Sequence, residues 1–216
     1  MICDDFRLRL SRAAGYSDEH FAAFLLNNDP LAGKLTAAQR RELITGAIDS
    51  GASVARELSE RFAAKLPTEV ACLLGGKIVA GNLRGSRLVL SNYDPHAATI
   101  TLNRAVIEKL EQCQLSQRLL PATFSPAEVA VAHELFHHVE SSDQGIFSRH
   151  FKVTLWRLGP LRYRSTVAAA GEIAATVCAK ALCRLCFNPV LLEALTLYME
   201  DPSRLTEWFD RLDGAA

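Results

Sequence analysis

Residues 125–140 read SPAEVAVAHELFHHVE, and this stretch says most about how the chain folds. It opens with Ser125, which is followed directly by a proline and three residues later by a glutamate. This is the pattern of a helix capping box with proline in the first helical position. We therefore predict a helix that begins after Ser125 and runs to about Glu140. Apolar residues spaced through the stretch predict that the helix packs into the core.

The same stretch carries two histidines and a glutamate in a pattern that indicates metal chemistry. His133 and His137 are four residues apart, which places both imidazoles on one helix face, a turn apart. Glu134 points to a neighbouring direction, within reach of a water molecule at the metal. This His-Glu-x-x-His pattern is typical of zinc hydrolases, whose ion keeps one position open for water. We expect His133 and His137 to bind Zn²⁺ and Glu134 to act as the general base.

A catalytic zinc site needs a third protein ligand, and Glu172 is the preferred candidate. It lies within AAGEIAAT, residues 169–176, on a predicted helix of otherwise small and apolar residues. A lone carboxylate on such a helix needs a cation or a metal as its partner. The alternative for Glu172 is a solvated glutamate in a first helical turn. His150 is an alternative ligand if the chain reverses quickly, whereas Asp143 and Glu140 are poorer candidates.

The motif His-Glu-Leu-Phe-His, followed by Glu172 and Ala175, resembles the gluzincin class of zinc metallopeptidases. More narrowly, it is similar to small minigluzincin-like and ImmA/IrrE-like proteins over about residues 67–186. The resemblance implies a zincin-like fold, zinc held by the three candidate ligands, and peptide-bond hydrolysis with Glu134 as the general base. Many gluzincins have an aspartate four residues after the ligand glutamate, where it orients the first histidine. Here that position is Thr176, which we expect to lie behind a ligating histidine.

Around the motif, the sequence predicts an α+β fold that is mostly helical, with a small antiparallel sheet of three strands. Short runs rich in Ile, Val, Leu and Thr, bounded by turn residues, predict the strands at 77–80, 87–90 and 98–102. In zincin-like folds the strand that precedes the metal helix often forms the sheet edge beside the cleft. We therefore expect 98–102 to be the strand that pairs with an extended peptide.

The remaining segments read as helices without an intervening linker. We expect an N-terminal helical segment at 1–66 and a zincin-like metallopeptidase domain at 67–216, packed as one compact unit. Gly51 is expected to interrupt the helix that follows Thr36. A second long helix is predicted over about 166–186.

Composition limits the classes of partner. The chain has 216 residues, and its 24 Lys and Arg balance its 24 Asp and Glu. A peptide or protein substrate is therefore expected without nucleic acid or membrane, since either would usually require a basic face, although a local patch remains compatible with this balance. No signal-like segment is visible and the six cysteines read as reduced thiols, so we expect a cytoplasmic protein. No feature indicates an oligomeric state.

Some features leave alternatives open. Cys183 and Cys186 have the spacing of a metal or redox pair, but packing within a helix is the more common role of such cysteines. The candidates for the donor that stabilises an oxyanion are Tyr163, His150 and Tyr198. The alternative function is a zincin-like regulatory or binding module with little general proteolytic activity. The intact Glu134 favours catalysis, because a purely structural site does not need it.

Overall fold

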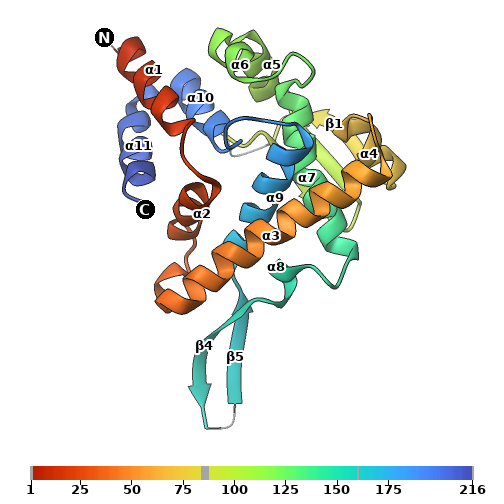
Figure 1. Ribbon diagram of the computed structural model, residues 1–216, viewed down its shortest axis with the longest axis vertical. Coiled ribbons are helices and arrows are strands. Elements are labelled where there is room, and N and C mark those ends of the chain that lie inside the picture. The colour runs from red at the N-terminus through yellow and green to blue at the C-terminus, as the bar shows by residue number, and fades with distance from the viewer. Residues whose placement is uncertain (1, 84–87, 160, 216) are drawn as a thin grey trace.

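The computed structural model describes residues 2–83, 88–159 and 161–215, and it shows a mostly helical α+β fold, as predicted (Figure 1). The helices are α1 (Ile2–Ala13), α2 (Asp18–Asn27), η1 (Ala32–Lys34), α3 (Ala37–Arg61), α4 (Pro67–Leu73), α5 (Arg104–Gln112), α6 (Gln114–Leu119), α7 (Pro126–Ser142), α8 (Phe147–His150), α9 (Ala168–Leu182), α10 (Leu191–Glu200), η2 (Pro202–Arg204) and α11 (Leu205–Asp213). The strands are β1 (Lys77–Gly81), β2 (Ser91–Asp94), β3 (Thr99–Asn103), β4 (Lys152–Leu158) and β5 (Leu161–Thr166). Within the described ranges, no helix combines the length and apolar character needed to cross a membrane.

The longest described helix, α3, packs along α9 through the centre of the molecule (Figure 1). Its start is a complete capping box: the Thr36 hydroxyl accepts from the N–H of Gln39, and the Gln39 side chain accepts from the N–H of Thr36. The interruption expected at Gly51 is wrong, because α3 continues through it. A Cβ at Gly51 would lie 2.2 Å from the carbonyl oxygen of Ala174. Glycine therefore lets the two helix backbones touch at this point.

Two hydrophobic clusters hold the helices together, and each combines early and late parts of the chain. In one, Phe24 of α2 meets Trp208 of α11, with ring centroids 5.2 Å apart. The other lies between α3, α7, α9 and the sheet, and its fully buried members include Leu43, Leu135 and Ile173. Because burial of apolar surface is the main driving force of folding, residues 1–66 contribute directly to the core around the central helices.

The three-stranded sheet has the order β1-β3-β2. Strands β2 and β3 pair antiparallel, but β1 runs parallel to β3, with Lys77 opposite Thr99. The predicted all-antiparallel sheet is therefore wrong for one of its two pairings. The expected edge position of 98–102 is also wrong, because β3 is central and pairs on both sides. Among the described strands, β2 is the edge strand that lies beside α7.

The position of β2 differs from the sequence prediction. A strand was expected at 87–90, but 84–87 lie outside the described residues and the observed strand begins at Ser91. Asn92 and Asp94 favour turns over strands in isolation. They adopt a strand here because it pairs with β3 and its side chains meet α7, which are tertiary contacts that local preference does not contain.

Helix α7 begins as predicted, after Ser125, whose hydroxyl accepts from the N–H of Glu128 at 3.2 Å. The Glu128 carboxylate does not complete a capping box. It accepts hydrogen bonds from the N–H and hydroxyl of Thr68 instead, at 3.1 and 2.7 Å. Because Thr68 lies in the first turn of α4, where backbone N–H groups lack helical partners, this contact fixes α4 against the start of α7.

A second sheet, absent from the sequence predictions, is a two-stranded hairpin formed by β4 and β5 between α8 and α9. It projects from one end of the helical body, at the bottom of Figure 1. The strands pair antiparallel from Lys152 opposite Thr166 to Leu158 opposite Leu161. The helix predicted over 166–186 is shorter at both ends: the hairpin occupies the chain up to Thr166, and α9 ends at Leu182, two residues before Arg184 with its positive φ of 52°.

Candidate metal centre

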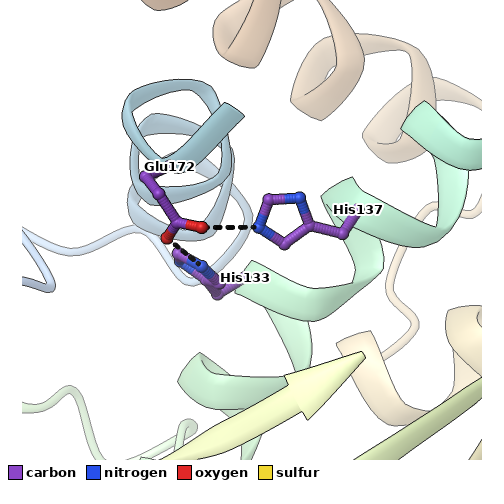
Figure 2. Close-up of side chains that lie close together, drawn as sticks. All are labelled: His133, His137 and Glu172. Carbon is purple, nitrogen blue, oxygen red and sulfur yellow. Dashed lines mark ion pairs between the residues drawn. The ribbon is translucent and has the colours of Figure 1, made fainter. Parts of the chain in front are cut away.

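His133 and His137 lie on consecutive turns of α7, and both point towards Glu172 of α9 (Figure 2). His133 Nε2 lies 3.3 Å from Glu172 Oε2, and His137 Nε2 lies 3.6 Å from Glu172 Oε1. All three donor atoms lie within 4.8 Å of one another. Two imidazole nitrogens and a carboxylate oxygen at this spacing fit a metal ion, and the donor set suits zinc. The half-exposed Glu172 side chain keeps the group open to the solvent.

Close packing of α9 on α7 brings the third donor to the histidines. Gly171 precedes Glu172, and a Cβ at this position would lie 3.3 Å from Glu140 Oε1 and 3.6 Å from His137 Cε1. A larger side chain would therefore press on the very residues that form the site. The small residues noted in the sequence before Glu172 have this role, since they let the helix approach closely enough for its carboxylate to reach both imidazoles.

The negative charge of Glu172 and the positive charge of His133 stabilise each other. Burial tends to raise the pKa of Glu172, but its hydrogen bond to His133 and the charges of both histidines outweigh this effect and lower the pKa to about 2. Burial tends to lower the pKa of His133, but its contact with Glu172 and the nearby charge of Glu134 raise it above its usual value. The metal-free site thus favours a protonated His133 beside an ionised Glu172. A metal cation would take the place of that proton.

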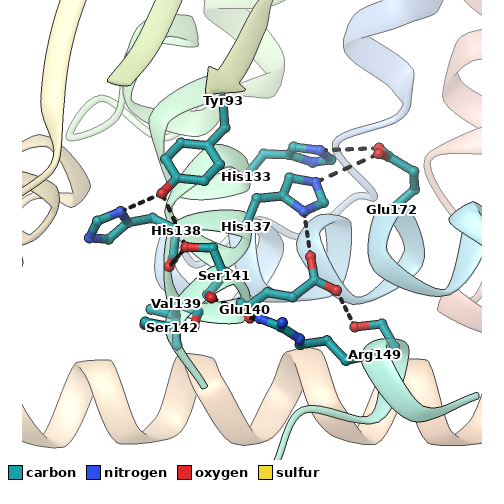
Figure 3. Close-up of polar contacts among 11 residues, drawn as sticks. Tyr93, His133, His137, His138, Val139, Glu140, Ser141, Ser142, Arg149 and Glu172 are labelled. Atoms are coloured by element: carbon teal, nitrogen blue, oxygen red, sulfur yellow. Dashed lines mark hydrogen bonds and ion pairs between the residues drawn. The ribbon is translucent and has the colours of Figure 1, made fainter. Parts of the chain in front are cut away.

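Glu140, one turn after His137, holds the other nitrogen of its ring (Figure 3). Glu140 Oε2 lies 2.9 Å from His137 Nδ1, and the other oxygen accepts a hydrogen bond from the Ser148 hydroxyl of α8. Burial tends to raise the pKa of Glu140, but these two hydrogen bonds outweigh it and lower the pKa. An ionised Glu140 accepts the Nδ1–H of His137, which leaves the Nε2 lone pair free to bind a metal.

The sequence assigned this supporting role to Thr176 instead. Thr176 is buried on α9 and lines the same cleft. Within the described part of the chain, the partners of His133 and His137 are Glu172 and Glu140 and no hydrogen bond joins them to the Thr176 hydroxyl, so a role for Thr176 behind a ligating histidine stays a prediction. Glu140 was considered only as a ligand, although its position three residues after His137 is the helix spacing that lets two side chains meet.

Glu134, the predicted general base, is buried beside the metal donors. It is 5% exposed, and its Oε1 accepts a hydrogen bond of 2.7 Å from the Ser91 hydroxyl. Ser91 lies on β2, so the edge strand fixes the orientation of the carboxylate and leaves Oε2 to accept a proton. Ser91 has no local signal for this role, because it lies far from Glu134 along the chain and in a segment that the sequence does not predict to be a strand.

The third histidine of the motif, His138, has a structural role. Its Nε2 lies 3.0 Å from the carbonyl oxygen of Leu74, and its Nδ1 lies 3.0 Å from the Tyr93 hydroxyl. A carbonyl oxygen can only accept, so Nε2 carries the hydrogen and Nδ1 accepts from Tyr93. His138 thereby ties α7 to β2 and to the end of α4, and Figure 3 shows it turned away from the metal donors.

A cleft of about 970 Å³ opens beside the three donors. Its polar lining includes Tyr93, Glu140, Ser141, Arg149 and Glu193, and its apolar lining includes Leu25, Leu88, Leu90, Val129, Val190 and Leu192. Within the described residues, none of the three tyrosine or histidine candidates for oxyanion stabilisation lines this cleft. Tyr163 lies on the hairpin, His150 Nε2 meets the carbonyl of Gln144, and Tyr198 stacks on Phe6. The position of His150 also removes it as the alternative third ligand.

The cysteines near the end of α9 do not form a second metal site. Cys183 is buried and Cys186 is exposed, and burial raises the pKa of the Cys183 thiol to about 12. A thiol with so high a pKa stays protonated, and only a thiolate binds a metal well. In the part of the chain that the structure describes, the metal donors of α7 and α9 form the only such group.

In comparisons with models of protein families, with curated proteins and with solved structures, no match was found. The geometry of the chain's own residues is therefore what bears on its function. Three features indicate that function: the converging donors of His133, His137 and Glu172, the buried Glu134 carboxylate beside them, and the cleft onto which they open.

Proposed function

We propose that this protein is a zinc-dependent metallopeptidase that hydrolyses peptide bonds, with Glu134 as the general base. One observation carries the proposal: the donors of His133, His137 and Glu172 converge beside the buried Glu134 carboxylate, at a cleft of about 970 Å³. Two imidazoles with one carboxylate are a donor set used by catalytic zinc sites, which leave a fourth position open. We place the protein in the gluzincin class, with a zincin-like fold, on the sequence motif alone.

The chain's own residues can perform the proton transfers of this reaction. Zinc, when bound, supplies a Lewis acid that lowers the pKa of water and polarises a carbonyl oxygen. Glu134 accepts the proton of the attacking water on Oε2, while Ser91 holds Oε1. The same carboxyl group then gives the proton to the leaving amine. Glu140 keeps the His137 ring in one orientation throughout.

The substrate proposed is an extended peptide or a protein segment. Strand β2 (Ser91–Asp94) lies at the edge of its sheet and lines the cleft, so its outer backbone can pair with an added strand. The peptide-pairing role expected for 98–102 therefore passes to β2. We also propose a cytoplasmic location, because the five cysteines whose state the structure describes are free thiols.

The proposal is tested by metal analysis together with a cleavage assay. We expect one zinc per chain in the purified protein and a loss of stoichiometric zinc in His137→Ala, since two ligands seldom hold zinc firmly. Glu134→Gln should retain zinc and lose cleavage of casein and of a degenerate peptide library, because an amide cannot accept the water proton. Glu207→Gln, at an exposed position of α11, is the matched control and should retain both properties.

Each part of the proposal has an outcome that contradicts it. Full zinc content in His137→Ala would refute the metal assignment. Cleavage by Glu134→Gln at the wild-type rate would refute the general-base role. A zinc-loaded wild type that cleaves nothing in the library would favour the alternative function, a regulatory or binding module built on the same site.

A further inference from the structure

The β4–β5 hairpin has a surface unlike that of the whole chain. No acidic residue occurs from Lys152 to Thr166, although acids and bases are equal in number over the chain. Its large apolar side chains are also unusually exposed: Trp156 by 52%, Leu158 by 70%, Leu161 by 62% and Tyr163 by 52%. A contiguous apolar cluster of this kind on a protein surface marks a site of interaction.

The register of the hairpin places these apolar residues on one face. Trp156 pairs with Tyr163 and Leu158 pairs with Leu161, and residues two apart on a strand share a face. We call this set the apolar face: Trp156, Leu158, Leu161 and Tyr163. The two leucines lie at the tip, and the two aromatic rings stack on each other one step nearer the body, with centroids 5.9 Å apart. Arg162 and Arg164 alternate with them on β5 and belong to the opposite face.

The root of the hairpin is a concentration of positive charge. A hollow of about 450 Å³ is lined there by Lys34 of η1, Gln39 of α3, and Lys152, Val153, Thr154, Trp156 and Arg164 of the hairpin. None of the described lining residues is acidic, and none of the three cations makes an ion pair with a described carboxylate. We call Lys34, Lys152 and Arg164 the cationic root. Their like charges repel one another, and an anion bound between them would relieve this repulsion, so the cationic root is suited to an anionic partner.

We propose that the hairpin docks on the surface of an anionic lipid bilayer. From tip to root its apolar face presents leucines and then an aromatic pair, which suits the acyl boundary and the interface, while Lys152 and Arg164 lie nearer the body on the opposite face, where they can meet lipid phosphates. Arg162, on the other face, has a stem long enough to keep its charge among the headgroups. A single-stranded nucleic acid would stack its bases on ring faces, which the two leucines at the tip do not supply.

This inference goes beyond the proposed function and does not depend on it, because no metal donor lies on the hairpin. Its basis is charge complementarity together with the layered order of the side chains. The balanced charge of the whole chain predicts no membrane partner. The net charge of a chain, however, does not show whether cations gather at one place on its surface.

Tryptophan fluorescence tests the docking directly. The chain has two tryptophans, and Trp208 is buried at 1% exposure, so a change in emission on vesicle binding reports Trp156. With vesicles of equimolar phosphatidylcholine and phosphatidylglycerol, we expect a blue shift and quenching by brominated lipid. Pure phosphatidylcholine vesicles should produce neither. Trp156→Phe should remove the signal while the protein still sediments with the mixed vesicles.

Paired substitutions separate the two parts of the hairpin. Leu158→Ser with Leu161→Ser should weaken binding to mixed vesicles by about tenfold, since the apolar tip is lost. Lys152→Gln with Arg164→Gln should weaken it by about fivefold for each charge removed. The control Leu8→Ser replaces a leucine that is 71% exposed on α1 and should leave binding unchanged. Circular dichroism melts establish that each variant is folded.

Failure of the wild-type protein to bind mixed vesicles overturns the proposal, as does equal binding to both kinds of vesicle. A loss of binding in Leu8→Ser as large as that in the hairpin variants also overturns it. Binding of a fluorescent single-stranded oligonucleotide without any response to vesicles would assign the hairpin to nucleic acid instead.

Discussion

Glu140 reaches the metal donors only through His137, whose Nδ1 it holds at 2.9 Å. Glu140→Gln keeps the size of the side chain but removes the charge that makes it a strong acceptor. Mutation of a carboxylate that holds a ligating histidine typically lowers metal affinity by about tenfold to a hundredfold. We expect zinc affinity, measured by competition with a chromophoric chelator, to fall by about that factor in Glu140→Gln. The visible spectrum of the cobalt-substituted protein should also change, because the His137 ring loses its fixed orientation.

Two serines provide the comparison. Ser148→Ala removes one of the hydrogen bonds to Glu140 and should weaken zinc binding by less than Glu140→Gln does. Ser142→Ala lies on the same helix at an exposed position and should leave zinc binding unchanged. Wild-type affinity and an unaltered cobalt spectrum in Glu140→Gln would show that Glu140 does not position His137.

The stability of the metal-free protein should depend on pH through His133 and Glu172. The lowered pKa of Glu172 adds stability above its ordinary value of 4.5, which is lost as the pH falls towards 2. The raised pKa of His133 adds stability below its ordinary value of 6.5, which is lost as the pH rises through the raised pKa. The pair therefore stabilises the metal-free fold most between pH 4.5 and 6.5.

Thermal melts of chelator-treated protein measure this effect. The difference in melting temperature between wild type and Glu172→Gln should be larger within that window than at pH values above it. Zinc affinity should change in the opposite sense and rise with pH, because a ligating imidazole must lose its proton. A difference in melting temperature that does not vary with pH would contradict the ion pair.

Some of these site residues can be predicted from their spacing along the sequence, and others cannot. His133, Glu134 and His137 follow from helix periodicity alone, and Glu172 follows from the high cost of a lone carboxylate on an apolar helix. Ser91 could not be found in this way, because its contact with Glu134 exists only once the sheet packs on α7. Functional residues whose partners are distant in the sequence carry no local signal.

At the scale of elements, the contact between α3 and α9 sets the position of Glu172. In Gly51→Ala the new methyl group would meet the backbone of Ala174 at 2.2 Å, and a backbone cannot give way as a flexible side chain can. We expect a net loss of about 1–3 kcal/mol in the free energy of unfolding, despite the better helix propensity of alanine. Zinc affinity should also fall, because α9 is displaced.

Gly33→Ala is the matched control for this substitution. A Cβ at Gly33 meets nothing within 4 Å, so its stability should stay within about 0.5 kcal/mol of the wild type. Urea unfolding and chelator competition on both variants measure the two effects. A Gly51→Ala protein as stable as Gly33→Ala would show that the helices can separate at no cost.

The helices were more predictable than the strands, for a physical reason. Thr36 and Ser125 begin their helices with hydrogen bonds to residues three positions on, so the signal lies within one turn of sequence. Strand β2 is stabilised by β3 and α7, and its polar residues read as a turn. The hairpin did carry a local signal, because Leu161 and Tyr163 alternate with Arg162 and Arg164 just after a turn that contains Gly159.

At the scale of the molecule, the early helices are bound to the late ones by contacts distant in sequence. The Tyr16 hydroxyl donates to Asp213 at 2.7 Å, and Phe24 packs edge-on against Trp208. A fragment of residues 67–216 would expose both clusters of the core. We expect it to lose cooperative thermal unfolding and to bind a dye for exposed apolar surface, as judged by circular dichroism and fluorescence. A sharp melt with retained zinc binding would show instead that 67–216 folds independently.

The route of the chain between His137 and Glu172 has a mechanical consequence. The chain leaves α7, forms α8 and the hairpin, and returns into α9, so an ion held at both ends would close this excursion into a ring. A closed ring restricts the unfolded chain, much as a cross-link does. Force applied at the hairpin tip would then act on the ligand bonds and not on the packing of α9. In single-molecule pulling, we expect the hairpin to unzip first and the two helices to part only when the ion is released, at a higher force with zinc than without it.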